Sequence, residues 1–235
     1  MESLLYVLGL QKAAKLAEYI GHDCVAQEYR ERAIKVQKAV RAFCMGEVTA
    51  GGRKVDLIQD DPGVPEYSTH CQVFAVLTQT VDMVDGKEML RETVGNEKYP
   101  QCSVAMGYYL LRALEMTDWY EKSDDIWNTW REMLDNHLTT CVENDTDARS
   151  DCHAWGAVAL YELPAVILGV RPAKPGFAEI EITPRMGYLT EASGKVITPK
   201  GEVFVHWKKA EDGSCMLEYV LPEGLKLSQG EKAGQ

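Results

Sequence analysis

The chain has 235 residues, of which 46% are hydrophobic and 26% are charged, a composition typical of globular proteins and not of disordered or low-complexity chains. Its length allows one large domain or two smaller ones. Because 36 acidic residues outnumber 25 Lys and Arg residues, the net charge is −11. This charge argues against nucleic acid as a partner, since phosphate binding requires a clustered basic face.

Two amphipathic helices are predicted at the start of the chain, over residues 2–20 and 23–44. Their apolar residues recur at helical spacing, while Lys, Arg and Glu residues occupy the opposite face. Gly21 ends the first helix, because glycine readily adopts the left-handed conformation that closes a helix. We expect a helical hairpin with these residues on its inner faces: Leu4, Leu5, Leu8, Ala13, Leu16 and Ile20, then Val25, Tyr29, Ala33, Val36, Val40 and Phe43.

A long loop and a second group of helices are predicted next. Residues 46–68 are rich in Gly, Asp and Pro, and such a run of breakers is too long for a simple turn. Helical periodicity then resumes over residues 69–82, 86–94, 103–117, 120–135 and 153–167. We therefore expect about seven helices in all, packed as successive hairpins because most connections are short.

The hydrophobic period changes from helical to strand-like after Leu168. Isoleucines alternate with glutamates over residues 179–182, which indicates a half-buried strand. A Thr-Pro-Lys-Gly turn at 198–201 and an Asp-Gly pair at 212–213 are typical of β-turns and hairpins. The sequence therefore predicts an antiparallel β module of about sixty residues, with three side chains sharing one face: Val203, Val205 and Trp207.

Residues 139–156 form the densest cluster of functional residue types in the chain. Four carboxylates, an arginine, a histidine and a tryptophan fall within one short stretch: Glu143, Asp145, Asp147, Asp151, Arg149, His153 and Trp155. Side chains of these types can bind a cation, cap a helix or process a sugar.

Three interpretations of this stretch stay open from composition alone. A calcium loop that begins at Asp145 would need Gly and Glu where the chain has Ser150 and Gly156, so we expect no metal. Ser150 or Asp151 could cap a helix that begins near His153. In a sugar-processing pocket, a carboxylate would activate water, polar side chains would bind hydroxyl groups, and an aromatic ring would stack on the sugar.

Six motifs carry a resemblance that spans most of the chain: Thr139-Thr140-Cys141-Val142-Glu143, Arg149-Ser150-Asp151-Cys152-His153-Ala154-Trp155, Leu168-Gly169-Val170-Arg171-Pro172, Pro175-Gly176-Phe177, Thr198-Pro199-Lys200-Gly201 and Val205-His206-Trp207. In this order they resemble the C-terminal part of bacterial α-L-rhamnosidases of glycoside hydrolase family 78. The segments at 69–77 and 109–115 are similar to preceding helices of that family's catalytic barrel.

The resemblance implies an α+β, multidomain fold. Residues 1–168 would form the C-terminal half of an (α/α)6 catalytic toroid, and residues 169–235 would form an antiparallel β-sandwich. It also implies cleavage of terminal α-L-rhamnose with inversion, so the expected partner is a rhamnose-containing carbohydrate and no cofactor is expected. The family's general base maps to Glu143 and its sugar-contacting histidine to His153. Cys141 and Asn144 depart from the family pattern, because many relatives carry Phe or Trp there.

An inverting glycosidase needs two carboxyl groups, roughly 6.5–9.5 Å apart, and Glu143 supplies one of them. The resemblance places the general acid in an earlier segment that ends in Gly-Trp, and this chain has no Gly-Trp dipeptide. We therefore expect a C-terminal piece of a longer enzyme that is inactive alone. The alternatives are a non-catalytic carbohydrate-binding or assembly module, and an inverting (α/α)6 glycosidase that acts on another sugar.

Structural interpretations compete with functional ones at several positions. Glu143 could be a surface carboxylate, and His153 could pack at a helix start. Trp155 has helical spacing with Val158, which favours a core residue. His70 lies on an apolar stripe and is expected to be a core or pocket-floor histidine, and His206 is assigned no role.

Cysteine usage and the lack of targeting signals bear on the compartment. The seven cysteines contain no C-x-x-C pair and are odd in number, a pattern typical of small buried hydrophobic residues and not of a disulfide framework. This pattern favours a reducing, cytoplasmic environment. We find no apolar run of about 18 residues and no signal peptide, and therefore expect no membrane association. A half-toroid would leave apolar helix faces uncovered, and such patches predict self-association.

Overall fold

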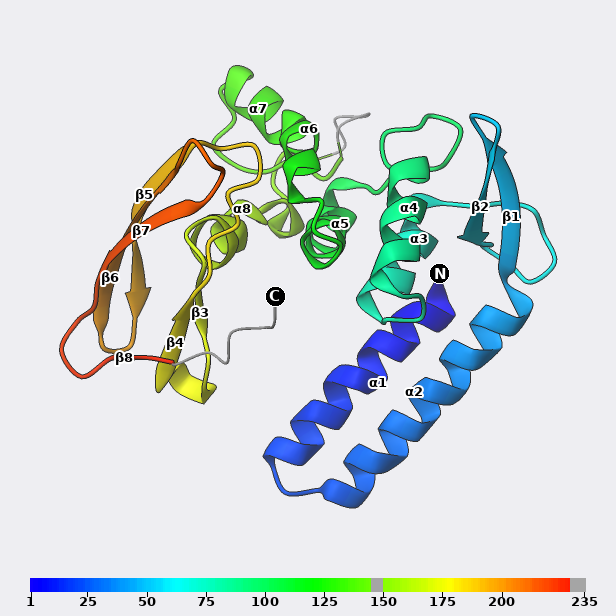
Figure 1. The fold of residues 1–235 in the computed structure, drawn as a ribbon, viewed down its shortest axis with the longest axis horizontal. Helices are drawn as coiled ribbons and strands as arrows, with labels where there is room; N and C mark the ends of the chain where they lie inside the picture. Colours follow the sequence, from blue (N-terminus) through cyan, green and yellow to red (C-terminus); the bar gives the residue numbers. More distant parts are fainter. Residues whose placement is uncertain (145–149, 229–235) are drawn as a thin grey trace. The chain divides into compact units, whose positions relative to one another are not determined.

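The computed structural model describes residues 1–144 and 150–228. The chain divides into two compact units, Met1–Trp119 and Tyr120–Gln235, whose elements are labelled in Figure 1. The first unit contains helices and one β-hairpin, whereas the second contains short helical segments and two three-stranded sheets. The α+β class is therefore confirmed, and the toroid and the sandwich stay predictions.

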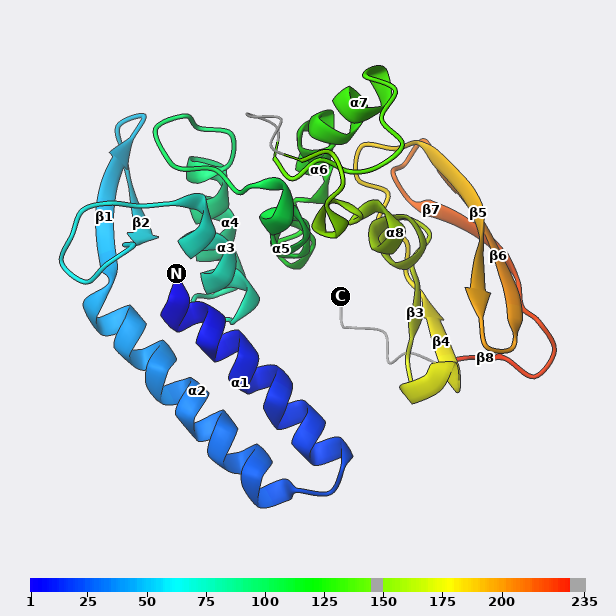
Figure 2. The same ribbon diagram turned by 180° about the vertical axis from the view of Figure 1, so that it is seen from behind.

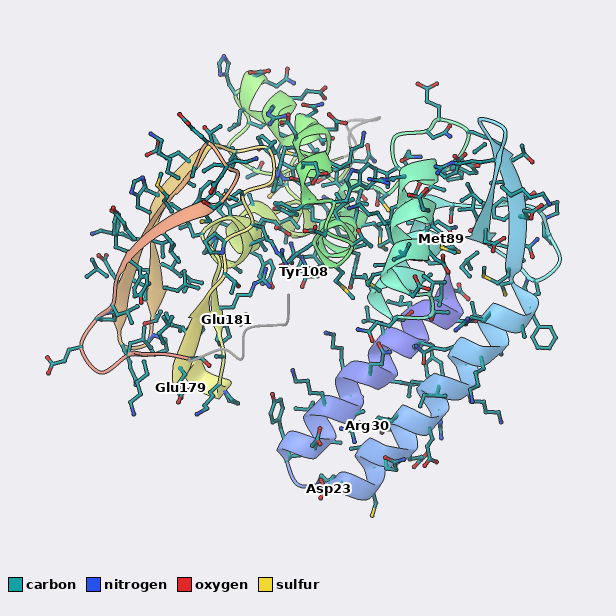
Figure 3. The ribbon with its side chains drawn as sticks, viewed as in Figure 1. Asp23, Arg30, Met89, Tyr108, Glu179 and Glu181 are labelled. Atoms are coloured by element: carbon teal, nitrogen blue, oxygen red, sulfur yellow. The ribbon has the colours of Figure 1, made fainter. Side chains whose placement is uncertain are left out.

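The first unit begins with the expected helical hairpin, formed by α1 (Glu2–Tyr19) and α2 (Asp23–Phe43). The two helices lie side by side in both views (Figures 1 and 2). Gly21 has a φ of 78° in the turn, a conformation that glycine adopts without strain. Arg30, labelled on α2 in Figure 3, forms a 2.5 Å ion pair with Glu18 of α1.

The inner face of α1 differs from the prediction. Leu16 and Ile20, expected inside, are 61% and 62% exposed, because α1 has apolar residues on two faces and the hairpin covers one of them. On α2, Val25 and Phe43 are likewise exposed. The buried residues of α1 are Leu4, Val7, Leu10, Ala14 and Ala17.

Residues 45–58 form a β-hairpin where the sequence predicted a loop. Strands β1 (Met45–Ala50) and β2 (Arg53–Ile58) pair antiparallel. Gly51 and Gly52 connect them with φ values of 56° and 83°, as a two-residue type I′ turn requires. The Gly-Gly pair was therefore a hairpin signal, and the Pro-rich residues that follow it obscured that signal.

Helices α3 (Thr69–Leu77), α4 (Met83–Thr93) and α5 (Val104–Met116) complete the first unit. Helix α3 is shorter than predicted, and α4 starts earlier than predicted. The Asp82 carboxylate sets the start of α4, because it accepts two hydrogen bonds of 2.9 Å from backbone amides of the first turn, as in a helix N-cap. Helix α3 packs against both α4 and α5, so most of its residues are buried.

The second unit begins with helical segments that are shorter than the sequence predicted. In place of one helix over 120–135, the chain forms α6 (Ser123–Ile126) and α7 (Asn128–Asp135), which meet at Trp127. In place of one helix over 153–167 it forms a 3-10 turn (Ala154–Gly156), α8 (Ala159–Glu162) and a π-helical turn (Leu163–Ile167). Pro164 lies in the π-helical turn, where its missing N–H excludes the usual helical hydrogen bond.

Two sheets follow. Strands β5 (Glu191–Thr198), β6 (Gly201–Lys209) and β7 (Cys215–Val220) form an antiparallel sheet, and β3 (Val170–Pro172), β4 (Glu179–Ile182) and β8 (Lys226–Leu227) form the other. The pairing of β4 with β8 is parallel, so the module is not wholly antiparallel as predicted. On β4, whose glutamates are labelled in Figure 3, Ile180 is 0% exposed, whereas Ile182 is only partly buried, like those glutamates. The shared face of β6 is confirmed: Val203, Val205 and Trp207 are 0% exposed.

The change from helix to strand occurs at Gly169, as the sequence predicted. Its φ is 76°, and a Cβ there would lie 2.3 Å from the backbone nitrogen of Pro184, so this position requires glycine. The indole N–H of Trp207 on β6 donates to the Ile167 carbonyl at 2.7 Å. The second unit therefore joins the last helical turn to the sheet through a buried hydrogen bond.

Two other expectations concern the chain as a whole. Within residues 1–144 and 150–228, no helix is both long enough and apolar enough to cross a membrane. All seven cysteines lie in the described part of the chain, and each is a free thiol. The expectation that they are buried was wrong for most of them, since only Cys71 is buried and three are exposed: Cys24, Cys152 and Cys215.

Candidate active site

The candidate site is built on two extended segments that run antiparallel, residues 140–143 and 150–153. The Glu143 amide donates to the Ser150 carbonyl at 2.8 Å, and the His153 amide donates to the Cys141 carbonyl at 2.8 Å. The Thr140 hydroxyl also donates to a backbone carbonyl of the second segment. These bonds hold residues that are ten positions apart in the sequence next to each other.

Glu143, His153 and Trp155 lie together at this pairing. The Nε2 atom of His153 is 3.9 Å from Oε1 of Glu143, and the two side chains are 27% and 10% exposed. The His153 and Trp155 rings are 4.5 Å apart between centroids and inclined by 37°. The Trp155 indole donates to the Glu143 backbone carbonyl at 3.2 Å. The sequence thus predicted two residues that the structure brings into contact.

Gly156 holds the turn that follows the site. Its carbonyl accepts a 2.7 Å hydrogen bond from the Trp130 indole of α7. A Cβ at this position would lie 2.4 Å from the Cβ of Cys141, well inside the usual distance of about 3.5–4.0 Å between carbon atoms in contact. Glycine is therefore required here so that the turn can pack against the segment that carries Glu143.

Two structural interpretations of this stretch were wrong. No α-helix begins at His153, so neither Ser150 nor Asp151 caps one; the cap of the 3-10 turn has no side-chain hydrogen bond. The amides of Glu143 and His153 are used in the antiparallel pairing instead. Trp155, predicted to be a core residue, is 47% exposed, because the short 3-10 turn does not continue the helical spacing on which that prediction depended.

Trp155 is the residue of this site that sequence reasoning missed. Its place in the Cys-His-Ala-Trp motif, two residues after His153, was the available signal. The Trp130 contact with Gly156 left no local signal, because 26 residues separate its partners.

The other singled-out residues lie elsewhere or outside the described ranges. Asp145 and Asp147, invoked for calcium, fall in the gap between residues 144 and 150. In the part of the chain that the structure describes, no group of three or more His, Cys, Asp or Glu residues is arranged to hold a metal ion. His70 is half-buried, and burial lowers its pKa. His206 forms a 2.7 Å hydrogen bond with Glu191, which raises the pKa of the imidazole.

Comparison with known proteins bears on these features. Residues 169–228 match the model of the bacterial alpha-L-rhamnosidase C-terminal domain. This part of the chain is therefore similar to the C-terminal domain of a rhamnosidase. This stretch begins at Gly169, where helix gives way to strand. The comparison with curated proteins found no significant match.

Solved structures extend the likeness over nearly the whole chain. The family 78 rhamnosidase of Bacillus sp. GL1 is 25% identical with a TM-score of 0.76, over 95% of this chain and 25% of that protein. The α-L-rhamnosidase of Dictyoglumus thermophilum is 19% identical with a TM-score of 0.72, over 93% of this chain and 25% of that protein. The α-L-rhamnosidase of Streptomyces avermitilis, solved with L-rhamnose, is 17% identical with a TM-score of 0.68, over 96% of this chain and 22% of that protein. The resemblance inferred from the motifs is confirmed, and the chain spans about a quarter of the length of these rhamnosidases.

Proposed function

We propose that this chain is the C-terminal part of an inverting α-L-rhamnosidase that removes terminal α-L-rhamnose from glycosides or polysaccharides, with Glu143 as its general base. The observation that carries the proposal is the pairing of Glu143 with His153, whose side chains approach within 3.9 Å. Both residues belong to motifs of the rhamnosidase resemblance, and the antiparallel pairing of their segments holds them together.

The reaction would place different demands on the three side chains. The Glu143 carboxylate removes a proton from water while the water oxygen bonds to the anomeric carbon. The bond to the leaving oxygen breaks, and that oxygen takes a proton from a general acid. His153 would hydrogen-bond a sugar hydroxyl, because its side chain is 27% exposed beside the Glu143 carboxylate. Trp155 would offer an aromatic face to the apolar side of the sugar ring.

We further propose that the general acid lies in a part of the enzyme outside these 235 residues, so that this chain is inactive alone. The chain covers 25% of the Bacillus rhamnosidase, and its sequence lacks the Gly-Trp that marks the acid segment in the family resemblance. A base without its acid leaves the departing oxygen unprotonated, and general acid catalysis typically contributes about 10²–10⁴-fold to the rate.

The first experiment incubates the purified chain with nitrophenyl α-L-rhamnoside. We expect no nitrophenol release above trace level, and clear release would refute inactivity. The second experiment introduces Glu143→Gln into the longer enzyme that contains this segment. Loss of the base should lower kcat by about 10²–10⁴-fold, and sodium azide should restore turnover, because azide attacks the anomeric carbon without deprotonation.

The matched control in the longer enzyme is Glu132→Gln. Glu132 is an exposed glutamate on α7 of the same unit, and its substitution should leave turnover unchanged. Undiminished hydrolysis by the Glu143→Gln enzyme would contradict the role of the base, whereas a loss without azide rescue would indicate that the substitution disturbs the fold.

Self-association is a second proposal for the isolated chain. Leu16 and Tyr19 of α1, with Ile20 directly after it, are 61–63% exposed, and an uncovered apolar patch of this kind is a site of association. Light scattering at increasing protein concentration should show a rising average mass, which Leu16→Glu with Ile20→Glu should abolish. A strictly monomeric wild-type chain would contradict the proposal.

We also propose a reducing, cytoplasmic location, on the basis of the seven free thiols. Rapid alkylation in intact cells, followed by mass spectrometry, should find all seven thiols unpaired. Disulfide-linked peptides in that digest would contradict the proposal.

A further inference from the structure

The turn that carries the His153 and Trp155 rings is weakly held from within. It is a single 3-10 turn (Ala154–Gly156), and its cap residue, His153, forms no side-chain hydrogen bond there. The Gly156 amide donates to the His153 carbonyl at 3.2 Å, which is longer than the usual distance of about 2.9–3.0 Å. Hydrogen-bond geometry in short 3-10 segments is poor, so contacts from other elements must fix the orientation of the two rings.

Trp130 of α7 supplies one such contact. Its indole N–H donates to the Gly156 carbonyl at 2.7 Å, and an indole has no second donor. The Trp130 ring is itself held, because it meets the Trp127 ring edge to face, with centroids 5.2 Å apart and an interplanar angle of 69°. Edge-to-face contact is a favourable arrangement of two aromatic rings, and Trp127 is only 8% exposed. Trp130 therefore ties the turn to a well-anchored part of α7.

Gly156 contacts the other side of the site as well. A Cβ there would lie 2.4 Å from the Cβ of Cys141, so the turn packs closely against the segment at 140–143. The Cys141 carbonyl also accepts the His153 amide at 2.8 Å. The turn is thus held between α7 on one side and the segment that carries Glu143 on the other.

The contacts of the two rings with Glu143 are weaker than the Trp130 hydrogen bond. The Trp155 indole donates to the Glu143 carbonyl at 3.2 Å, and His153 Nε2 lies 3.9 Å from Oε1 of Glu143. The first distance is at the upper end of the usual hydrogen-bond range and the second is beyond it. Neither contact would hold the turn in place if Trp130 released it.

Trp130 acts on the sugar site only indirectly. Its N–H is occupied by the Gly156 carbonyl, and its ring lines a cavity of about 560 Å³ beside α7. Among the described residues, that lining includes none of the three site residues Glu143, His153 and Trp155. Any effect of Trp130 on the reaction therefore passes through the turn.

We propose that Trp130 is a positioning residue of the sugar site. Its hydrogen bond to the Gly156 carbonyl holds the turn so that the His153 and Trp155 rings stay beside the Glu143 carboxylate. As far as it concerns the reaction, this inference rests on the proposed function. The geometric part, that Trp130 sets the arrangement of the two rings, holds for the chain alone and is tested there.

Trp130→Phe and Trp127→Phe form a matched pair of variants. Each keeps an aromatic ring in the edge-to-face pair and removes one indole N–H. The Trp130 N–H is bonded to the turn, whereas the Trp127 N–H is buried and has no partner among the described residues. Both variants therefore change the packing of α7 in a similar way, and only Trp130→Phe removes a bond to the turn.

The first experiment records NMR spectra of the 235-residue chain at one fixed pH. His153 is one of five histidines, and His153→Gln assigns its signals. Because the centroids of the Trp155 and His153 rings are 4.5 Å apart, the indole ring current displaces the His153 ring signals from those of a free histidine. Trp130→Phe should move these signals toward the free value, whereas Trp127→Phe should leave them unchanged.

A second donor-free variant covers the case in which Trp130→Phe does not fold. Trp130→Met has no indole N–H, and its flexible side chain fills irregular space, so it should move the His153 signals in the same direction. A dispersed amide spectrum identifies the folded variants. Unchanged His153 signals in a folded donor-free variant, or equal shifts in Trp127→Phe, would overturn the proposal.

The second experiment measures hydrolysis of nitrophenyl α-L-rhamnoside by the longer enzyme. His153 and Trp155 bind the sugar in the ground state and in the transition state alike, so their displacement should raise KM and change kcat little. Trp130→Phe should raise KM about fivefold, as the loss of one hydrogen bond of typical strength gives. Trp127→Phe should leave KM unchanged. A merely structural role would instead reduce the amount of folded enzyme, which lowers the apparent kcat and leaves KM as it was.

The results separate this inference from the proposed function. A lower kcat at unchanged KM in Trp130→Phe would overturn the positioning role. Undiminished turnover by the Glu143→Gln enzyme would instead refute the rhamnosidase proposal, and the His153 signals of the isolated chain would still decide whether Trp130 sets the arrangement of the two rings.

Discussion

The packing of Gly156 against Cys141 gives the most direct test of the site's architecture. In Gly156→Ala, the new Cβ would lie 2.4 Å from the Cβ of Cys141 and 3.3 Å from the Val142 carbonyl oxygen. Carbon atoms in contact prefer about 3.5–4.0 Å, so the turn and the segment that carries Glu143 must separate by about 1 Å. The closest contact joins two Cβ atoms, whose positions the backbone fixes, so a rotamer change cannot relieve it.

The expected cost follows from that overlap. Overpacking a well-packed site costs about 1–3 kcal/mol, and for 150–250 residues each kcal/mol corresponds to about 2–4 °C in Tm. Gly156→Ala should therefore lower the Tm of the 235-residue chain by about 2–12 °C. Thermal unfolding followed by tryptophan fluorescence measures the change in Tm, since four of the five tryptophans lie in residues 120–235.

A double-mutant cycle tests the cause. Cys141→Gly removes the opposing Cβ, so Gly156→Ala should cost at least about 1 kcal/mol less in that background. Gly9→Ala is the control, because Gly9 lies within α1 with nothing near its missing Cβ, and alanine should stabilise that helix by about 1 kcal/mol. Equal costs of Gly156→Ala in the two backgrounds would refute the reasoning.

Two further predictions concern the β module. Trp207→Phe removes the donor to the buried Ile167 carbonyl and should lower the free energy of unfolding by about 1–3 kcal/mol. Urea titration measures this loss. An unchanged free energy of unfolding would contradict the stabilising role of the hydrogen bond between β6 and the last helical turn. His206 lies between Glu191 and Glu218, at 2.7 and 3.5 Å, and the hydrogen bond with Glu191 raises the pKa of the imidazole. Because the folded pKa is the higher one, the pair should stabilise the fold fully below the unfolded pKa of about 6.5. That stabilisation should disappear as pH rises through the folded pKa. In urea unfolding curves recorded at pH 5–9, His206→Gln should remove this dependence of the free energy of unfolding on pH. An unchanged pH dependence in the variant would refute the role of His206.

Part of the candidate site could be predicted from sequence. Glu143 and His153 were singled out because their motifs keep the order of a known family, and the structure places them 3.9 Å apart. Trp155 was assigned to the core, because a helical period was extended through residues that form only a 3-10 turn. Backbone pairing between residues 140–143 and 150–153 takes amides that a helix would need, and such non-local pairing leaves no periodic signal.

Local patterns in the sequence determined most elements of this chain. Helical periodicity predicted the α1–α2 hairpin. Alternation predicted strands β4 and β6, and the Thr-Pro-Lys-Gly and Asp-Gly signals predicted the turns on either side of β6, because side-chain direction repeats every 3.6 residues in a helix and every two in a strand. Only the tertiary structure decided which of the two apolar faces of α1 is buried and that β8 pairs parallel with β4. It also decided that the helix predicted over 120–135 is interrupted at Trp127 and that the helix predicted over 153–167 is interrupted after Gly156. These outcomes depend on which segments that are distant in the sequence pack together. That packing is set by the free energy of the whole unit, and no local sequence pattern encodes it.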